Sequence, residues 1–204
     1  MQDLHAITSV EQLRRVIPAP SPVAQRKVSN TLDENARRFI AESPLIFVST
    51  ADRRLNIDVS PKGDAPGFVR VADSTTLLIP ERSGNRLTYG FQNLLETGTI
   101  GLIFLVPGVR ETLRVNGTAT LTQDPELLQQ FAVDGKAALL CTRVAIGECF
   151  FHCAKALIRS RLWQPEHWRD GASKDSAVKQ WAACFGIEEA AVRKQLEQDY
   201  RHNL

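Results

Sequence analysis

The sequence predicts a mainly β protein: an antiparallel, Greek-key-like β-barrel flanked by N-terminal and C-terminal helices. Two observations predict it. Six or seven short apolar or alternating runs follow one another between residues 45 and 153, separated by turn residues. Helical spacing dominates both ends of the chain, and two or three helices are inserted among the mostly sequential strands. No repeat or long linker divides the 204 residues. We therefore expect a single domain over 1–204: a helical arm (1–43), a barrel (44–163) and C-terminal helices (164–204).

The N-terminal arm contains two predicted helices. Apolar residues at helical spacing run from Val10 to Ile17, and prolines at 18, 20 and 22 end that segment. Residues 31–34, Thr-Leu-Asp-Glu, form a capping box at the start of the second helix. Phe39 and Ile40 supply its apolar face, and Ser43-Pro44 closes it.

The strands follow from Leu45. The predicted strands before residue 110 are Leu45–Thr50, Asn56–Ser60, a hairpin of Phe68–Ala72 with Thr76–Pro80, and the buried strand Thr99–Val106. Thr112–Leu121 alternates strictly between apolar and polar residues. Gly117 falls on the apolar side, which indicates a barrel corner or a close backbone approach.

The rest of the chain mixes both patterns. Asp124-Pro125 predicts the start of a helix of about ten residues. Ala138–Ile146 and Glu148–Cys153 are the last predicted strands, and Ala177–Phe185 and Glu188–Tyr200 are amphipathic helices on either side of Gly186.

Composition excludes several classes. A net charge of +2 lacks the basic excess of a dedicated nucleic-acid binder. The N-terminus shows no signal-peptide pattern, so we expect a cytoplasmic protein with four reduced cysteines. Cys149, His152 and Cys153 cluster, but no second Cys/His pair stands at zinc-site spacing, and Cys149 reads as strand core. We therefore predict no metal site.

Common enzyme signatures are missing too. The sequence has no Gly-x-Gly-x-x-Gly after a strand, no Walker loop, no Gly-x-Ser-x-Gly and no His-Glu-x-x-His. Hydrolases of the common types are disfavoured.

Polar residues instead gather at three predicted strand ends. The first group is Ser60 and Lys62, the second lies within residues 80–86, and the third is Arg110, Thr112 and Arg114. Guanidinium groups, hydroxyls and glycine-freed backbone amides are what a phosphate group requires. The alternative for each cation is an ordinary solvated charge.

Four segments, in this order, resemble the pyridoxamine 5'-phosphate oxidase-like flavoproteins. They are 58–63 (Asp-Val-Ser-Pro-Lys-Gly), 77–86 (Leu-Leu-Ile-Pro-Glu-Arg-Ser-Gly-Asn-Arg), 106–117 (Val-Pro-Gly-Val-Arg-Glu-Thr-Leu-Arg-Val-Asn-Gly) and 150–163 (Phe-Phe-His-Cys-Ala-Lys-Ala-Leu-Ile-Arg-Ser-Arg-Leu-Trp). The resemblance covers roughly residues 40–168. It implies an FMN-binding split-barrel homodimer, with one FMN in each of two grooves between the subunits.

The resemblance also implies site residues. Ser60 and Lys62 would lie beside the flavin ring or ribityl chain, and Ser83, Asn85 and Arg86, assisted by Arg82, would hold the phosphate. Thr112, with Arg110 or Arg114, would reach the ring edge. The second subunit would complete the site with Lys155, Arg159, Ser160 and Trp163.

The expected function is FMN-dependent hydride transfer between a small organic substrate or NAD(P)H and the flavin, in which the cofactor carries the chemistry. Residues 161–165, Arg-Leu-Trp-Gln-Pro, only loosely match the oxidase's Arg-Leu-x-Pro ending, so pyridoxine 5'-phosphate is not implied as the substrate. Two alternatives stay open: a flavin-binding sensor or carrier without turnover, and a haem or deazaflavin binder on the same barrel. His152 and His167 are the candidate haem ligands.

Aromatic residues beyond the barrel have two interpretations. Trp163 is expected either to stack on the flavin or to anchor the C-terminal helices on the barrel. For Trp168 we favour the second interpretation, and Trp181 is predicted to lie in a helix core.

Overall fold

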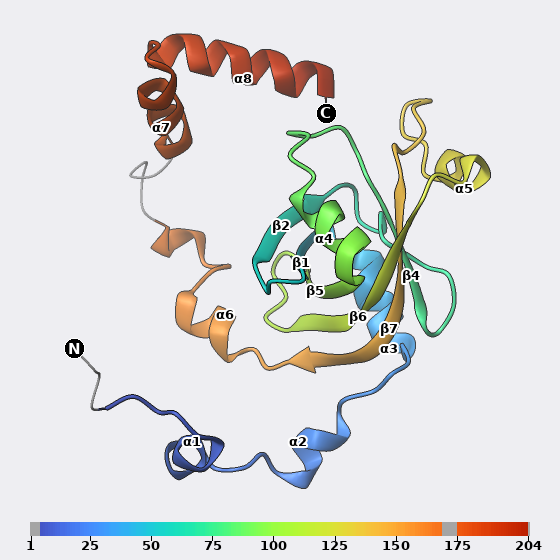
Figure 1. Ribbon diagram of the computed structural model, residues 1–204, viewed down its shortest axis with the longest axis vertical. Coiled ribbons are helices and arrows are strands. Elements are labelled where there is room, and N and C mark those ends of the chain that lie inside the picture. The colour runs from blue at the N-terminus through green and yellow to red at the C-terminus, as the bar shows by residue number, and fades with distance from the viewer. Residues whose placement is uncertain (1–4, 169–174, 204) are drawn as a thin grey trace.

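Seven strands form one antiparallel sheet in a computed structural model of the chain, which describes residues 5–168 and 175–203 (Figure 1). The strands are β1 (Leu45–Ala51), β2 (Ile57–Gly63), β3 (Arg70–Val71), β4 (Thr76–Pro80), β5 (Thr99–Leu105), β6 (Thr112–Thr122) and β7 (Cys141–His152). Their order is β2-β1-β5-β6-β7-β4-β3, and every neighbouring pair is antiparallel. The predicted mainly β split-barrel class is confirmed.

Helices flank the barrel at both ends of the chain. They are α1 (Val10–Val16), α2 (Pro22–Arg26), α3 (Glu34–Glu42), α4 (Tyr89–Thr97), α5 (Pro125–Gln130), α6 (Lys155–Ser160), α7 (Ser176–Phe185) and α8 (Glu189–Asn203), with a 3₁₀ turn at Pro165–His167. None of the helices in the described part of the chain combines the length and apolar character needed to cross a membrane. The C-terminal segment predicted at 164–204 includes residues 169–174 and 204, which lie outside the described residues.

The core lies between the inner face of the sheet and α3. Phe104 and Val115 are completely buried, and Phe39 and Ile40 of α3 pack into the same cluster. Asp33, and not the predicted Thr31, caps α3: its carboxylate accepts a hydrogen bond from the backbone N–H of Ala36 at 2.8 Å. A carboxylate beside a helix N-terminus also interacts favourably with the helix dipole, whereas the Thr31 hydroxyl is engaged with Ser29.

Other element boundaries differ from the sequence prediction. The two last predicted strands are one continuous strand, β7, which passes through Gly147. Helix α5 has six residues instead of about ten. Helices α2, α4 and α6 were not predicted.

Gly117 lies where the backbone of β6 comes close to the backbone of β7, as its place on the apolar side of the alternating strand predicted. Asn116 of β6 pairs with Glu148 and Gly117 pairs with Ile146, so the extra residue, Gly147, forms a bulge in β7 opposite these two residues. A Cβ atom at position 117 would lie only 2.0 Å from the carbonyl oxygen of Ala145. Only glycine fits at this crossing of the two strands.

The barrel does not close: the edge strands of the sheet are β2 and β3, and the end of β4 that β3 does not cover forms no β-ladder with β2. Two ion pairs of opposite polarity bridge the gap. Lys62 of β2 pairs with Glu81, directly after β4, and Asp64 beyond β2 pairs with Arg82 at 2.9 Å. Side chains therefore join the two sides of the barrel where backbone hydrogen bonds do not.

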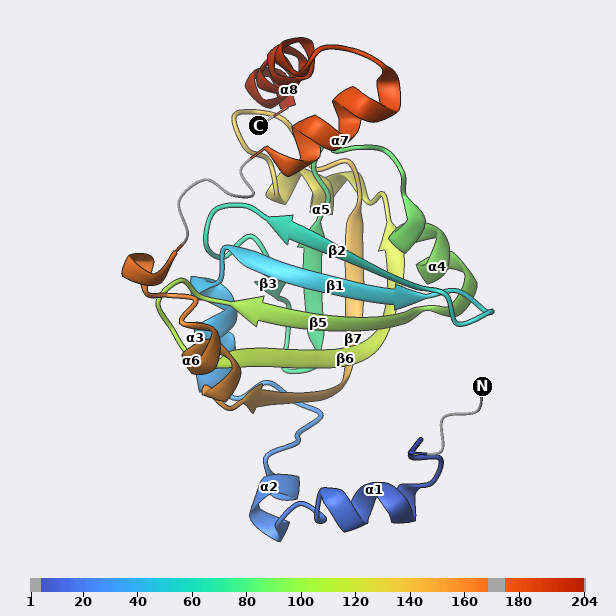
Figure 2. The ribbon, with the colours of Figure 1, turned by 90° about the vertical axis from the view of Figure 1, so that its left-hand side faces the viewer.

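The outer face of β2, β1, β5 and β6 lies open between the terminal helices. In Figure 2 these strands face the viewer, with α7 and α8 at one end of the long axis and α1 and α2 at the other. Side chains of Ile57, Val59, Phe47 and Ile103 point outward from this face and are 71%, 60%, 38% and 38% exposed. We call these four residues the outer apolar patch.

Candidate functional site

A pocket of about 400 Å³ opens at the split of the barrel. Its lining comes from β1, β2, β4, β5, β7, the loop after β4 and the start of α4: Val48, Thr50, Asp58, Val59, Ser60, Pro61, Lys62, Ile79, Glu81, Gly84, Asn85, Leu87, Thr88, Tyr89, Gly90, Phe91, Leu94, Ile100 and Thr142. An apolar floor with a few polar groups is the usual character of a small-molecule site, and the volume lies in the usual range of roughly 300–1,000 Å³.

Lys62 crosses the pocket. Its ammonium group donates a hydrogen bond to the Glu81 carboxylate and lies 4.7 Å from the centre of the Phe91 ring. The side chains of Lys62 and Glu81 are 19% and 23% exposed. A cation partly removed from water, with an aromatic ring below it and one carboxylate beside it, is held in a fixed place.

Asp58 and Ser60 form the second polar group of the pocket. The Ser60 hydroxyl donates to Oδ2 of Asp58 at 2.8 Å. Gly90 passes close to the same carboxylate, since a Cβ atom there would lie 3.2 Å from Asp58 Oδ2. The start of α4 therefore lies directly against β2.

The loop from Glu81 to Thr88 carries unusual backbone geometry. Arg86 and Thr88 have φ angles of 61° and 57°, a left-handed conformation that costs a residue other than glycine of the order of 1 kcal/mol or more. Leu87 N–H donates to the Asn85 side chain at 3.0 Å, which holds the turn. Thr88 is the N-cap of α4 but forms no side-chain capping bond, so that side chain leaves the first backbone donors of α4 uncapped where Tyr89, Gly90 and Phe91 line the pocket.

The cations of this loop differ in their surroundings. Arg82 is engaged twice, with the Asp64 carboxylate and with the carbonyl oxygen of Phe131 at 2.7 Å. Arg86 is exposed, and among the described residues it forms no ion pair or side-chain hydrogen bond. Arg86 is thus the guanidinium of this loop that is available to an anion.

The structure brings some of the predicted site residues together. Ser60, Lys62 and Asn85 line the pocket, and Arg82, Ser83 and Arg86 belong to the loop that borders it. The remaining predicted residues line none of it: Arg110, Thr112, Arg114, Lys155, Arg159, Ser160 and Trp163.

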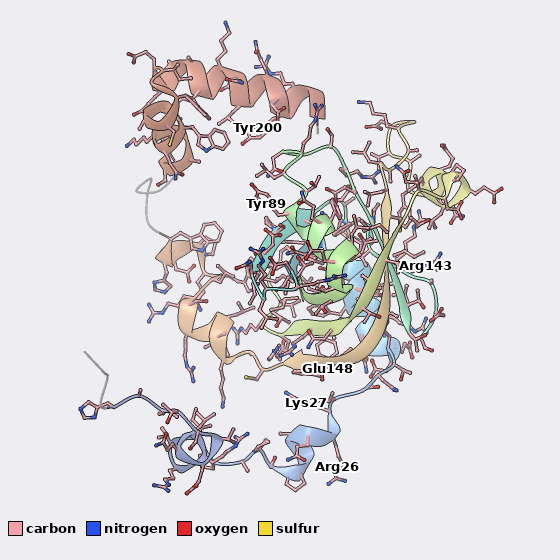
Figure 3. The ribbon with its side chains drawn as sticks, viewed as in Figure 1. Arg26, Lys27, Tyr89, Arg143, Glu148 and Tyr200 are labelled. Atoms are coloured by element: carbon pink, nitrogen blue, oxygen red, sulfur yellow. The ribbon has the colours of Figure 1, made fainter. Side chains whose placement is uncertain are left out.

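These remaining residues form a second region where β6 begins and β7 ends. Arg114 donates to Glu148 Oε1 at 3.2 Å, and the same oxygen accepts from Asn116 at 2.6 Å. Trp163 donates from Nε1 to the carbonyl oxygen of Val109 at 2.7 Å, which fixes the turn after α6 against the start of β6. In Figure 3, Tyr89 at the pocket and Glu148 on β7 lie at separate parts of the barrel.

His152 lies in the second region. Its ring centre is 4.9 Å from that of Phe150, and burial together with the positive charges of Arg114 and Lys27 lowers its pKa below the usual value. Alternation along β7 places Cys149 on the inner face and His152 on the outer face, and no group of three or more metal-ligating side chains is assembled in the described part of the chain.

Sequence reasoning missed several lining residues. Asp58, Glu81, Tyr89, Gly90 and Phe91 line the pocket without having been proposed. A usable signal existed: Lys62 and Asp64 after one strand mirror Glu81 and Arg82 after another, with the charges reversed.

Comparisons with known proteins agree with this geometry. The fold is a split barrel with a cofactor-sized pocket at its split, and the sequence pattern of the family described as pyridoxamine 5'-phosphate oxidase matches residues 32–152. The chain belongs to the pyridoxamine 5'-phosphate oxidase family. A search of curated proteins finds no match.

Several solved structures are similar to part of this chain at low sequence identity. HupZ from Group A Streptococcus has a TM-score of 0.49 and 18% identity, over 59% of this chain and 93% of HupZ. A candidate pyridoxamine 5'-phosphate oxidase from Lactobacillus delbrueckii has a TM-score of 0.46 and 22% identity, over 60% and 95% of the two chains. HutZ, the haem storage protein of Vibrio cholerae, has a TM-score of 0.41 and 14% identity, over 58% and 93%.

Proposed function

We propose that this protein is an FMN-dependent oxidoreductase, with FMN bound in the pocket at the barrel split. The observation that carries the proposal is the composition of that pocket. An apolar wall that contains Phe91 faces one fixed cation, Lys62, and the loop with the unpaired Arg86 lies at the rim. Membership of the family supports flavin as the ligand class.

The residues present fit the groups of FMN. The phosphate is a dianion, and Arg86, the Ser83 hydroxyl and the uncapped start of α4 supply positive charge and donors for it. A flat aromatic ring system suits the apolar floor of Val48, Ile79 and Leu94. No atom lies within 4 Å of the position that a Cβ atom would take at Gly84, and this open space lets a ligand approach the loop backbone.

Bound flavin would supply the acceptance and donation of a hydride. The chain's own residues then set electrostatics and orientation. Lys62 favours negative charge on the ring beside it, and Glu81 opposes that effect by partly neutralising Lys62. Asp58 accepts the hydrogen of the Ser60 hydroxyl, which leaves the hydroxyl oxygen as an acceptor toward the ligand.

We propose further that the protein acts as a homodimer. Two features support this. Lys155, Arg159, Ser160 and Trp163, which the resemblance assigns to a second subunit, lie outside the pocket of the same chain, so a second copy would have to supply them. The outer apolar patch leaves four aliphatic or aromatic side chains in water, and an exposed patch of this kind is typical of an interaction surface.

The absorption spectrum of freshly purified protein tests the cofactor. Bound FMN gives a yellow protein with flavin bands, and extraction of FMN as the released compound supports the proposal. A Soret band would instead favour the haem alternative, and a colourless protein that takes up no FMN would overturn the proposal.

Anaerobic reduction separates an enzyme from a binding protein. We expect NADH, NADPH or a small organic donor to bleach the flavin bands. The alternative function, flavin storage or sensing, predicts that no donor reduces the bound flavin while dithionite does.

A further inference from the structure

Two segments of the chain lie outside residues 32–152, which match the family, and both carry apolar side chains in water. They are the arm that holds α1 and the hairpin of α7 and α8. Neither serves the barrel core: α1 buries no residue, and α7 and α8 pack mainly against each other.

The α7–α8 hairpin is too small to be stable alone. Its core consists of Val178, Ala182 and Val192 with Leu196 beside them. Domains of under about 40 residues usually need a disulfide, a metal or an oligomeric partner. We therefore expect another part of a protein to pack against the hairpin.

The hairpin offers a groove for such a partner. The groove has a volume of about 760 Å³ and is lined by Trp181, Phe185, Ile187, Val192, Gln195, Leu196, Gln198 and Asp199. Trp181 was predicted to lie in a helix core, but it is 40% exposed, and Phe185 is 67% exposed. Asp199 is the single charged side chain among these lining residues, and it is acidic.

Helix α1 has complementary properties. Val10 and Leu13 stand at positions i and i+3 on one face of α1, and Ile17, the extended residue that caps the helix end, follows them; the three side chains are 71%, 38% and 57% exposed. Its last turn is basic, with Arg14 and Arg15. Between residues 5 and 28 the arm has four basic side chains and one acidic side chain.

The arm of one chain cannot fill the groove of that chain. Helix α1 and the α7–α8 hairpin lie at opposite ends of the long axis, on the same side of the barrel (Figures 1 and 2). A two-fold rotation can bring the outer apolar patches of two copies together with their long axes antiparallel. That arrangement sets the arm of each copy beside the hairpin of the other.

We infer that α1 of one copy docks Val10, Leu13 and the following Ile17 into the α7–α8 groove of the second copy. The inference rests on the proposed homodimer. The opposite arrangement, with parallel long axes, sets two basic arms against each other, and like charges disfavour it. Reciprocal exchange instead places the basic arm beside a groove that has no basic side chain among its described lining residues.

Disulfide trapping between two copies tests the inference. In a background with the exposed Cys153 and Cys184 replaced by serine, one copy carries Val16→Cys and the other Gln195→Cys. The two copies bear different affinity tags, are co-expressed, purified through both tags and oxidised with diamide. Ala190→Cys replaces Gln195→Cys as the matched control, since Ala190 is exposed on α8 and does not line the groove.

The inference predicts a covalent dimer that joins positions 16 and 195, at several times the yield of the 16–190 control. Sedimentation of the unoxidised protein separates the failures. A monomer would overturn the proposed homodimer and this inference together. A dimer whose 16–195 yield does not exceed the control, or one in which 195–195 linkage dominates, would overturn only the exchange of arms.

Hydrogen exchange provides a second measurement that needs no introduced cysteine. Leu13→Asn in the full-length protein should accelerate amide exchange in α7 and α8, because the hairpin loses its covering helix. Unchanged exchange in residues 176–203 in a protein that is still dimeric would contradict the inference.

Discussion

Replacement of Arg86 by alanine should weaken FMN binding while leaving riboflavin binding almost unchanged. The two ligands differ only in the phosphate, so the difference isolates the phosphate contact. Arg86 has no protein partner among the described residues, so no ion pair must be broken before it binds an anion. Its substitution therefore leaves no buried charge behind.

The expected loss of FMN binding free energy follows from the exposure of Arg86. A charge-assisted hydrogen bond contributes about 1.5–3 kcal/mol, and an exposed side chain belongs at the lower end of that range. A loss of about 1.5 kcal/mol weakens FMN binding by about tenfold. Raising the salt concentration should reduce the difference between wild type and variant, because exposed charges are screened.

Flavin fluorescence quenching measures both dissociation constants. Arg86→Gly is the matched control for the backbone: it also removes the guanidinium but relieves the left-handed conformation at φ 61°. Both variants should lose FMN affinity alike. Equal weakening of FMN and riboflavin, or no change in either, would show that the phosphate is bound elsewhere.

Three further predictions concern the pocket, the bulge and the second region. Lys62→Met should lower the flavin reduction potential and Glu81→Gln should raise it, each by about 30 mV, which is about 1.4 kcal/mol for a two-electron couple; potentiometry that finds the same sign for both would contradict the assigned electrostatics. Gly117→Ala should reduce the free energy of unfolding by about 2–3 kcal/mol in urea denaturation, since its Cβ meets the Ala145 carbonyl oxygen at 2.0 Å, whereas Gly147→Ala, with 3.6 Å to its nearest neighbour, should change it by less than about 0.5 kcal/mol. His152 has a lowered pKa in the folded protein, so the unfolded chain binds the proton more readily, and stability should fall as the pH decreases through about 6.5; His152→Gln should flatten the stability profile between about pH 7.5 and 5.5, and an unchanged profile would refute this assignment.

The barrel could be predicted largely from the sequence because its signals are local. Alternation over Thr112–Leu121 marked β6, and a glycine on the apolar side of that strand marked the crossing with β7. The remaining strand boundaries depend on pairing between strands, which no local sequence pattern shows. Gly147 interrupts the apolar pattern but continues β7, because the ladder with β6 resumes on both sides of the bulge.

Helix α4 shows why the pocket could be predicted only in part. It begins at a left-handed threonine without a side-chain cap, so no start signal precedes it. Its residues Tyr89, Gly90 and Phe91 then line the pocket. The Lys62–Glu81 contact likewise joins residues from opposite sides of the split, a pairing that no local pattern contains.

The ion pairs of the fold also change how the basic residues identified in the sequence are interpreted. Arg82, Arg114 and Lys62 all have carboxylate partners in the fold. Arg86 has no carboxylate partner among the described residues, which distinguishes the cation that we propose to bind the ligand from the paired ones. The spacing of these basic residues in the sequence does not by itself show which of them form ion pairs.

FMN titration of the purified dimer tests the central claim most directly. Sedimentation with absorbance detection at flavin wavelengths reports binding and mass in one experiment. The account predicts one FMN per chain, co-sedimenting with a dimer. A monomer that binds FMN, or a dimer that binds none, would contradict it.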